Sequence, residues 1–247
     1  MKQAMILAAG LGTRLKPLTD TMPKALVPVN GQPLLDLNIH RLMGQGYGRF
    51  VVNVHHFAQQ IVDHVACQDY TSLVQFSDET SQLLETGGAL KKAQSLFDPE
   101  EPVLIHNVDI LDDLDFNWFR SHHQSDDDAV LLVSRRKTKR YLLFDNDMRL
   151  VGWTNIETGE VKSPLGSHLP PLTSLNTFAF SGIHSFSPRL FPLMESFPDR
   201  FSIIDFYLSV CHRSRIVGLV KDDLHVLDVG KLDSLEQAEA FMGHHHC

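Results

Sequence analysis

Cysteine is scarce in this sequence, and long apolar runs are missing from it. The three cysteines, Cys67, Cys211 and Cys247, are far apart and odd in number. They indicate neither a disulfide framework nor a paired-cysteine metal site, so a reducing cytoplasm is the expected compartment. No apolar stretch approaches the roughly 18 residues of a membrane span, so no membrane partner is expected. The apolar run "AMILAA" at 4–9 is too short for a signal peptide and is expected to be a buried strand.

Basic residues are outnumbered by acidic ones. The chain has 22 Lys and Arg against 30 Asp and Glu, which gives a net charge of −8 at pH 7 and a pI near 5.9. Nucleic-acid-binding proteins normally carry a broad basic surface, so nucleic acid is not expected as a partner. Phosphate binding would need a local cluster of cations, and residues 14–24 contain one.

The length and composition suit one large globular domain. The chain has 247 residues, of which 43% are apolar. We expect the domain to span 1–243, followed by a short histidine-rich tail at 244–247 that we predict to be disordered.

Strand and helix patterns alternate through the first 135 residues. We expect strands at 4–9, 50–54, 72–77, 102–107 and 129–133, and helices at 33–46, 57–66, 88–97 and 116–123. This order predicts an α/β fold with a doubly wound, mainly parallel sheet, covered by helices on both faces. Ligands of such sheets bind beyond the carboxyl ends of the strands. That rule singles out "GLGTR" at 10–14 and "NVD" at 107–109.

The alternation of strand and helix patterns ends near residue 134. Turn pairs, a proline-rich bend and short strand patterns predict a small, hairpin-rich insert at 134–177 that does not form a domain of its own. Strand character returns at 178–187. The segment 225–242 reads as a strand, a turn and a closing helix.

Glycines and cations follow the first strand closely. Gly10 and Gly12 allow backbone N–H groups to approach an anion, and Arg14 and Lys24 supply positive charge. The stretch lacks the last glycine of the G-x-G-x-x-G dinucleotide pattern and also fails the P-loop spacing. A nicotinamide-dependent oxidoreductase is therefore not expected. The glycines alone would equally suit an ordinary turn with two surface cations.

The combination of glycines, Thr-Arg and Pro-Lys carries more information. "LAAGLGTRLKPLTDTMPKALVPVNGQPLL" at 7–35 resembles the signature of the sugar-1-phosphate nucleotidyltransferases. "LETGGAL" at 84–90, "HNVDILDD" at 106–113, "FAFSGIH" at 178–184 and "LDVGKLDSLEQAE" at 227–239 resemble further segments of that family. The whole pattern is most similar to that of the short bacterial N-acetylmuramate-1-phosphate uridylyltransferases. The resemblance implies a Rossmann-like nucleotidyltransferase fold, with the 134–177 insert on the acceptor side.

The resemblance also implies a reaction and its participants. An oxygen of a sugar 1-phosphate would attack the α-phosphorus of a nucleoside triphosphate and release pyrophosphate, with Mg²⁺ as cofactor. UTP and N-acetylmuramate 1-phosphate are the expected substrates. Mannose 1-phosphate with GTP, phosphocholine with CTP, and a non-catalytic subunit that binds a nucleotide sugar stay open as alternatives. The oligomeric state stays open too.

The family pattern assigns roles to particular residues. Arg14 is expected to hold the β- and γ-phosphates, and Lys24, on an exposed loop, to reach the α-phosphate; these two are the expected catalytic residues. Nucleotide binding is assigned to Ala9, Gly10, Leu11, Gly12, Thr13, Arg14, Lys24, Thr86, Gly87, Gly88 and Asn107. Gly87 and Gly88 would admit a base, or else simply begin a helix.

The metal and acceptor sides complete the expected site. Asp109 and Asp228 each end an expected strand at the ligand-bearing edge and are the expected Mg²⁺ ligands. The acceptor is assigned to Glu85, Asn107, Arg140, Ser181 and Gly182. Glu85 would equally cap a helix, and Arg140 lies in "RRKTKR", which would equally be a solvated loop.

Two features depart from the family pattern or stand outside it. Val108 replaces a glycine usual in the family and is expected to narrow the pocket. Asp112, Asp113 and Asp115 fit loop and helix-cap positions and are not expected in the site.

Overall fold

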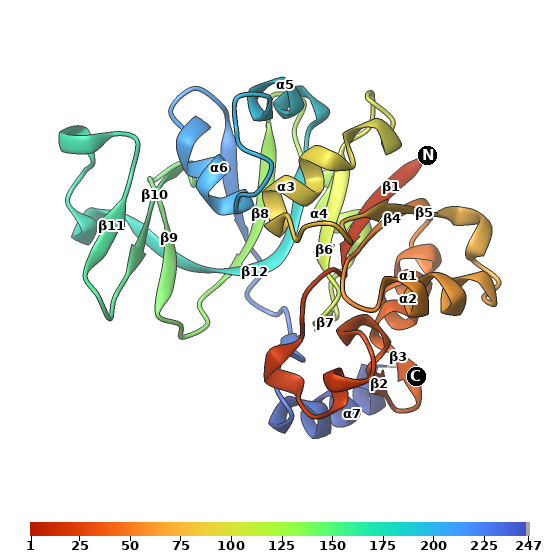
Figure 1. The fold of residues 1–247 in the computed structure, drawn as a ribbon. Helices are drawn as coiled ribbons and strands as arrows, with labels where there is room; N and C mark the ends of the chain where they lie inside the picture. The colour runs from red at the N-terminus through yellow and green to blue at the C-terminus, as the bar shows by residue number, and fades with distance from the viewer. Residues whose placement is uncertain (246–247) are drawn as a thin grey trace.

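One large sheet organises the molecule (Figure 1). The structure, a computed structural model, describes residues 1–245, with side chains up to residue 241. The strands are β1 (Lys2–Leu7), β2 (Pro28–Val29), β3 (Gln32–Pro33), β4 (Tyr47–Val54), β5 (Val74–Asp78), β6 (Val103–Asn107), β7 (Ile110–Asp112), β8 (Ala129–Ser134), β9 (Arg140–Phe144), β10 (Leu150–Asn155), β11 (Glu160–Lys162), β12 (Asn176–Phe186), β13 (Ile216–Val220) and β14 (Val226–Asp228). The helices are α1 (Leu34–Gly44), α2 (Ala58–Ala66), α3 (Glu85–Lys92), α4 (Phe116–Ser121), α5 (Phe191–Met194), α6 (Ile203–Val210) and α7 (Asp233–His245).

The sheet is mixed, with a parallel part and an antiparallel part. Its path runs β11-β10-β9-β12-β6-β1-β4-β5, and β8 joins β12 to β13. The pairs among β6, β1, β4 and β5 are parallel, as is that between β8 and β13. The long strand β12 runs antiparallel to β6, β8 and β9, and therefore links the two parts.

Helices cover both faces of the parallel part, which confirms the predicted α/β fold. In β1, Ala4 and Ile6 belong to one buried core and Met5 to the other, as expected for side chains that alternate along a strand. The first core includes apolar residues of α1, α2, α4 and α7, and the second those of α3, α5 and α6. Figure 1 shows α3, α5 and α6 together at the top of the view and α1 and α2 at its right.

The expected elements of the first 135 residues are all present. β1 ends at Leu7, two residues early, because the N–H of Ala8 donates to the side chain of Asn53 (2.7 Å). The helix expected at 88–97 is α3, which begins at Glu85 and gives way after Lys92 to a short 3-10 turn.

The hairpins of the insert extend the sheet. β9, β10 and β11 form an antiparallel ribbon that joins the N-terminal end of β12, and they lie at the left of Figure 1. No element was predicted for the segment 188–224, which forms α5, α6 and β13.

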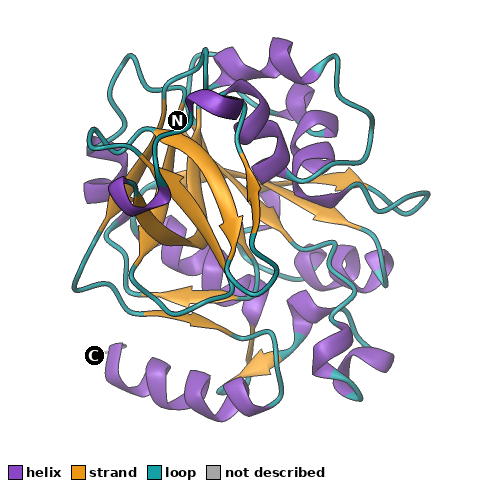
Figure 2. Cartoon of the chain, turned by 90° about the vertical axis from the view of Figure 1, so that its left-hand side faces the viewer, coloured by secondary structure: helices purple, strands orange, loops and turns teal. Residues whose placement is uncertain are grey.

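The C-terminal segment returns to the edge of the sheet where the parallel strands end. β14 pairs with β7, and α7 packs against β14 and β2 at the bottom of Figures 1 and 2. Within the described residues, His244 and His245 are the last residues of α7, while 246 and 247, the end of the predicted tail, lie outside the described part. In residues 1–245, none of the helices combines the length and the apolar character needed to cross a membrane.

Candidate active site

The ends of β1, β4 and β6 lie at one level in the middle of the sheet. Leu7 is paired with Asn107 of β6 on one side and with Asn53 of β4 on the other. The N–H of Val108 donates to the carbonyl oxygen of Leu7 (3.2 Å). The loops after β1 and β6, which the sequence singled out, therefore leave the sheet side by side, as expected at the carboxyl ends of parallel strands.

The loop after β1 is open and carries unpaired backbone donors. Gly12 has a φ of 63°, which glycine adopts without strain, and its carbonyl oxygen accepts from the hydroxyl of Thr19 (2.8 Å). A Cβ at Gly10 would meet no atom within 4 Å, and the side chains of Leu11 and Thr13 are exposed. In the described part of the chain, the N–H groups of residues 10–13 donate to no protein group. Such free donors are suited to phosphate oxygens.

Lys24 is buried, in contrast to the exposed position expected from the sequence. It begins a 3-10 turn (Lys24–Leu26) directly after Pro23, and 8% of its surface is exposed. Its ammonium forms an ion pair with Oδ2 of Asp109. A lysine is rarely buried without such a partner, and the pair explains how this one can be. The turn therefore fixes a cation against the loop that follows β6.

Asp228 lies next to Asp109, although 119 positions separate them in the chain. Asp228 is paired with Ile110 in the β7–β14 ladder, and the N–H of Val229 donates to the carbonyl oxygen of Asp109 (2.8 Å). A Cβ at Gly230 would lie 2.5 Å from Oδ1 of Asp228 and 2.5 Å from Nη2 of Arg14. The absence of a side chain at Gly230 thus lets Arg14 and Asp228 approach the same point.

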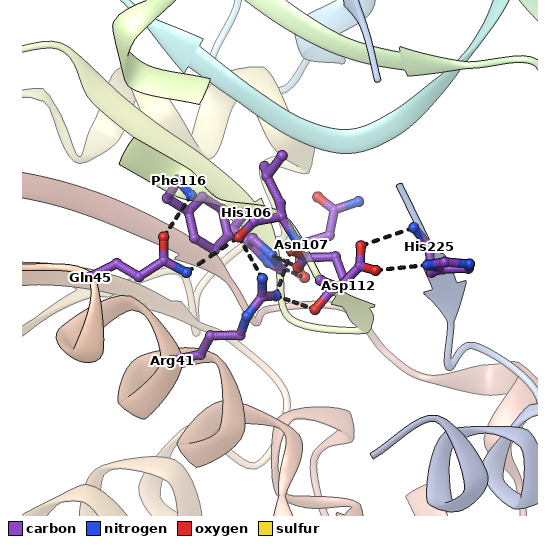
Figure 3. Close-up of polar contacts among 9 residues, drawn as sticks. Arg41, Gln45, His106, Asn107, Asp112, Phe116 and His225 are labelled. Carbon is purple, nitrogen blue, oxygen red and sulfur yellow. Dashed lines mark hydrogen bonds and ion pairs between the residues drawn. The ribbon is translucent and has the colours of Figure 1, made fainter. Parts of the chain in front are cut away.

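A buried polar network around Asp112 connects the elements that carry the site (Figure 3). Nε2 of His106 lies 3.0 Å from Oδ2 of Asp112, and Nδ1 lies 2.8 Å from the carbonyl oxygen of Asn107. Arg41 of α1 pairs with Oδ1 of Asp112, which also accepts from the N–H of Leu114 (2.9 Å). Burial alone would raise the pKa of Asp112, but His106 and Arg41 outweigh it and hold the pKa below its ordinary value. The network ties α1, the end of β6 and the end of β7 together.

A second contact fixes β14 to β7. The N–H of His225 donates to Oδ1 of Asp113 (2.9 Å), and Nδ1 of His225 lies 2.7 Å from Oδ2 of the same carboxylate. His225 stands at the right of Figure 3, at the start of the strand that ends in Asp228. The β7–β14 ladder therefore holds Asp109 and Asp228 at one end, and the contact between His225 and Asp113 closes its other end.

The neighbouring aspartates differ in role. Asp115 caps α4, because its side chain accepts from the N–H groups of Asn117 and Trp118, and the cap predicted from the sequence is confirmed. Asp112 is a buried member of the network, not a loop residue, because His106 and Arg41 neutralise it.

The start of α3 faces the same space from the other side. Glu85 has a φ of 62° and forms an ion pair with Arg200 (2.9 Å). The hydroxyl of Thr86 accepts from the N–H of Ile203 (2.9 Å). The N–H groups of Gly87 and Gly88 both donate to the carbonyl oxygen of Phe201, and a Cβ at either glycine would overlap the 199–201 segment. These two glycines thus let α3 pack closely against the chain that leads into α6.

A cavity of about 400 Å³ joins these parts. It is lined by Leu7, Ala9, Gly10, Lys24, Asn53, Leu83, Glu85, Thr86, Asn107, Val108, Asp109 and Ser202. The structure therefore brings together the expected residues at 9–10, 24, 85–86, 107 and 109. The expected residues at 11–14, 87–88 and 228 do not line this cavity. Val108, as expected, forms part of its wall.

A second cavity of about 490 Å³ lies against the insert. It is lined by Arg136, Thr138, Arg140, Tyr141, Leu142, Trp153, Asn155, Glu160, Lys162, Phe180, Ser202, Ile204, Asp205 and Leu208. Ser202, at the start of α6, lines both cavities, so the two meet there. Arg140 belongs to the second cavity and does not reach the first.

Ser181 and Gly182 lie in β12, between the two cavities. Gly182 has a φ of 79°, and a Cβ there would lie 2.9 Å from Nδ2 of Asn107. The pairing of β12 with β8 is irregular between Phe180 and His184. The hydroxyl of Ser181 is buried and has no hydrogen-bond partner among residues 1–245. Gly182 therefore leaves room for the amide of Asn107 at the edge of the first cavity.

The carboxylates of Asp109 and Asp228 are donors of the type that Mg²⁺ prefers. Within the described residues, no group of three or more His, Cys, Asp or Glu side chains could hold a metal ion. Mg²⁺ typically takes one or two protein carboxylates and fills its octahedron with waters and substrate phosphates. Asp109 and Asp228 supply two carboxylates beside the open loop, and the space at Gly230 keeps the second one accessible.

Several lining residues had no assigned role in the sequence. Asn53 is the second-last residue of the strand predicted at 50–54 and could have been found by the same edge rule that found Asn107. Ser202 and the residues of α6 come from the segment without a prediction. The apolar run at 203–210 indicated a buried element there but not its type.

Comparisons with known proteins identify the family of the chain. A model of the family described as nucleotidyl transferase matches residues 3–244. The chain is 30% identical to the N-acetylmuramate alpha-1-phosphate uridylyltransferase of Neisseria meningitidis serogroup B over 248 residues, covering 98% of this chain and 98% of that relative. It is 46% identical over 111 residues to the protein of the same name from Caulobacter vibrioides, covering 44% of this chain and 46% of that relative.

Solved structures match the fold over its whole length. HddC from Yersinia pseudotuberculosis, complexed with GMP-PN, has a TM-score of 0.75 at 24% identity, covering 98% of this chain and 100% of that chain. At this identity the likeness concerns the arrangement of helices and strands alone.

Proposed function

The chain belongs to the nucleotidyl transferase family, as a sugar-1-phosphate nucleotidyltransferase, and from this premise we propose that it joins UTP to N-acetylmuramate 1-phosphate. The products would be the UDP-sugar and pyrophosphate. The choice of UTP and of this acceptor is supported by the names of the two uridylyltransferase relatives.

The observation that carries the proposal is the meeting of Lys24 with Asp109 beside a loop of free N–H groups. An unpaired run of backbone donors at 10–13 suits the triphosphate. Lys24 supplies a fixed cation where the α-phosphate would lie, and Arg14 stands close to Asp228 for the outer phosphates. Cations and carboxylates at one strand edge are what the transfer of a nucleotidyl group requires.

The residues act mainly by position and charge. A sugar 1-phosphate is already an anion near neutral pH, so the site needs no strong general base. The barrier arises from bringing this anion to the triphosphate, and it falls when fixed cations offset the repulsion. Bound Mg²⁺ would neutralise phosphate charge, and Asp109 and Asp228 are the residues to hold it. Lys24 would then turn from Asp109 to the α-phosphate, where negative charge develops.

The remaining contacts divide between base and acceptor. Thr86, which lines the first cavity, would support the base and ribose, whereas Gly87 and Gly88 pack against 199–201 and keep α3 in place. Asn107 lines the first cavity next to Gly182 and would contact both substrates. The residues proposed to bind only the acceptor are Glu85, Arg140, Ser181 and Gly182.

The test is pyrophosphate release with Mg²⁺ across four nucleoside triphosphates and a panel of acceptors. The panel contains N-acetylmuramate, N-acetylglucosamine and mannose 1-phosphates together with phosphocholine. We expect release with UTP and N-acetylmuramate 1-phosphate. The Lys24→Ala variant, purified in parallel, is the control for contaminating activity and should release pyrophosphate about 10²- to 10³-fold more slowly than the wild type.

Other outcomes decide against particular parts of the proposal. Release with GTP and mannose 1-phosphate, or with CTP and phosphocholine, would keep the reaction type and refute the proposed substrates. Binding of nucleotide without release from any combination would favour a non-catalytic nucleotide-binding subunit.

A further inference from the structure

Four of the five cations of "RRKTKR" (135–140) separate into two groups in the structure. Arg135 forms an ion pair with Asp222 (3.6 Å), and its guanidinium lies 5.2 Å from the ring centre of Phe178. Lys139 forms an ion pair with Glu157 (2.6 Å). Neither lines the second cavity. Arg136 and Arg140 do line it.

These two arginines are without a carboxylate partner. Within residues 1–245, neither Arg136 nor Arg140 has an acidic oxygen within ion-pair distance. The one side-chain hydrogen bond of Arg136 goes to the carbonyl oxygen of Phe180 (3.1 Å). The two arginines therefore offer most of their donors to whatever occupies the cavity.

The two acidic side chains that line the second cavity, Glu160 and Asp205, both pair with Lys162. Nζ of Lys162 lies 3.8 Å from Glu160 and 3.6 Å from Asp205, and it stands 5.2 Å from the ring centre of Trp153. Lys162 thus offsets part of the charge of these two carboxylates. The charge of the cavity lining that has no opposite partner is positive, and it lies at Arg136 and Arg140.

The position of the second cavity decides which part of the acceptor it would receive. The reacting phosphate must lie at Lys24 and Asp109, which line the first cavity, and neither arginine lines that cavity. The cavities meet at Ser202, so an acceptor held by its phosphate in the first would extend its other end into the second. Trp153 and Tyr141 add aromatic surface there, which suits the apolar face of a sugar ring.

We propose that Arg136 and Arg140 bind a carboxylate on the acceptor sugar and make the enzyme selective for an acidic sugar 1-phosphate. Their forked donors match a carboxylate in two-point geometry. The proposal rests on the proposed function, because it needs the acceptor phosphate in the first cavity. It differs from a phosphate role for Arg140, because that role would be the same for every sugar 1-phosphate.

The experiment compares two acceptors that differ only in the lactyl ether on the sugar 3-oxygen, which carries the acidic group. N-acetylmuramate 1-phosphate carries a lactyl carboxylate, and N-acetylglucosamine 1-phosphate is the same sugar without it. kcat/KM for each acceptor is measured at saturating UTP and Mg²⁺ in the wild type, in Arg136→Gln and in Arg140→Gln. Arg135→Gln is the matched control from the same run of cations. Melting temperatures check that each variant is folded.

We expect each arginine variant to lose about 10- to 100-fold in kcat/KM for the acidic acceptor, the size typical of a lost charge-assisted hydrogen bond. The neutral acceptor should change by less than about 3-fold, and Arg135→Gln should leave both values unchanged. Arg140→Lys, which keeps the charge but loses the fork, should fall between the wild type and Arg140→Gln.

Two results would overturn the inference while leaving the proposed function intact. One is an equal loss on both acceptors, which would mean that the arginines hold the shared phosphate. The other is a set of arginine variants that lose nothing on the acidic acceptor. A wild type that prefers the neutral acceptor would overturn both the inference and the proposed acceptor. Transfer by the wild type to neither acceptor would instead refute the proposed substrates themselves.

Discussion

Replacing Asp112 by asparagine should destabilise the protein strongly at neutral pH. Both carboxylate oxygens receive donors: Oδ1 from Arg41 and the N–H of Leu114, and Oδ2 from His106. An asparagine presents one N–H₂ group, which must face at least one of these donors. The substitution also leaves the half-buried Arg41 and the buried His106 without their negative partner.

The expected magnitude follows from this burial. The side chains of Asp112 and His106 are each 1% exposed. Breaking a buried pair by removing one member typically costs about 3–5 kcal/mol in the free energy of unfolding. For a chain of this size that corresponds to a fall of roughly 6–20 °C in Tm. Asp113→Asn is the matched control, because its partner His225 is 67% exposed and the loss should stay below about 1 kcal/mol.

The pH dependence of the difference provides a second check. The folded-state pKa of Asp112 lies below its ordinary value, so the carboxylate stabilises the fold fully above the unfolded-state pKa, about 3.9 for aspartate. That contribution is lost as the pH falls through the folded-state pKa. The gap between wild type and Asp112→Asn should therefore not shrink between pH 7 and pH 5, and it should shrink below about pH 4.

Urea unfolding followed by circular dichroism measures both quantities. Unchanged m-values would allow the midpoints to be compared as stabilities. A loss below about 1 kcal/mol at pH 7 would refute the buried charge network. A gap that already shrinks between pH 7 and pH 5 would contradict the lowered pKa of Asp112.

Three further substitutions test the site and its support. Lys24→Ala should lower kcat by about 10²- to 10³-fold, as for the loss of one fixed charge at a reacting centre, and a kcat within 3-fold of wild type would exclude its role. Asp228→Asn should raise the Mg²⁺ concentration at half-maximal rate by about 10-fold or more at unchanged Tm, and an unchanged Mg²⁺ titration would remove it from the metal site. Gly88→Ala, whose Cβ would overlap the carbonyl oxygen of Asp199, should cost about 1–3 kcal/mol in urea unfolding. Gly44→Ala, with no atom within 4 Å, is its control, and an equal effect of the two would contradict the packing role.

Local patterns were enough to predict the parallel part of the sheet. The apolar runs that became β1, β4 and β6 are bounded by turn residues, and the amphipathic segments between them have one apolar face each. Because parallel strands expose their carboxyl ends at one edge, this order alone placed Gly10 and Asn107 in the same neighbourhood. In the structure the two strand ends are direct neighbours, with Leu7 paired to Asn107.

The antiparallel part and α6 were harder to predict. β12 pairs with three strands from distant parts of the chain, and pairing between distant strands leaves no periodic signal in the sequence. The α6 segment has apolar residues in nearly every position because it is buried, so its pattern resembles a strand as much as a helix. The sequence analysis assigned Arg140 of the second cavity to the acceptor but could not predict the wall that α6 contributes.

The sequence by itself determined the chemical types in the candidate site: the open glycine loop, the two cations and the two aspartates. Only the tertiary structure decided their arrangement. Lys24 is buried against Asp109, Gly87 and Gly88 are occupied by packing against 199–201, and Arg140 separates from Arg135 to face a different cavity. The reason is physical: residue type sets which charges and donors are available, whereas burial and pairing depend on segments far apart in the chain that meet only in the folded protein.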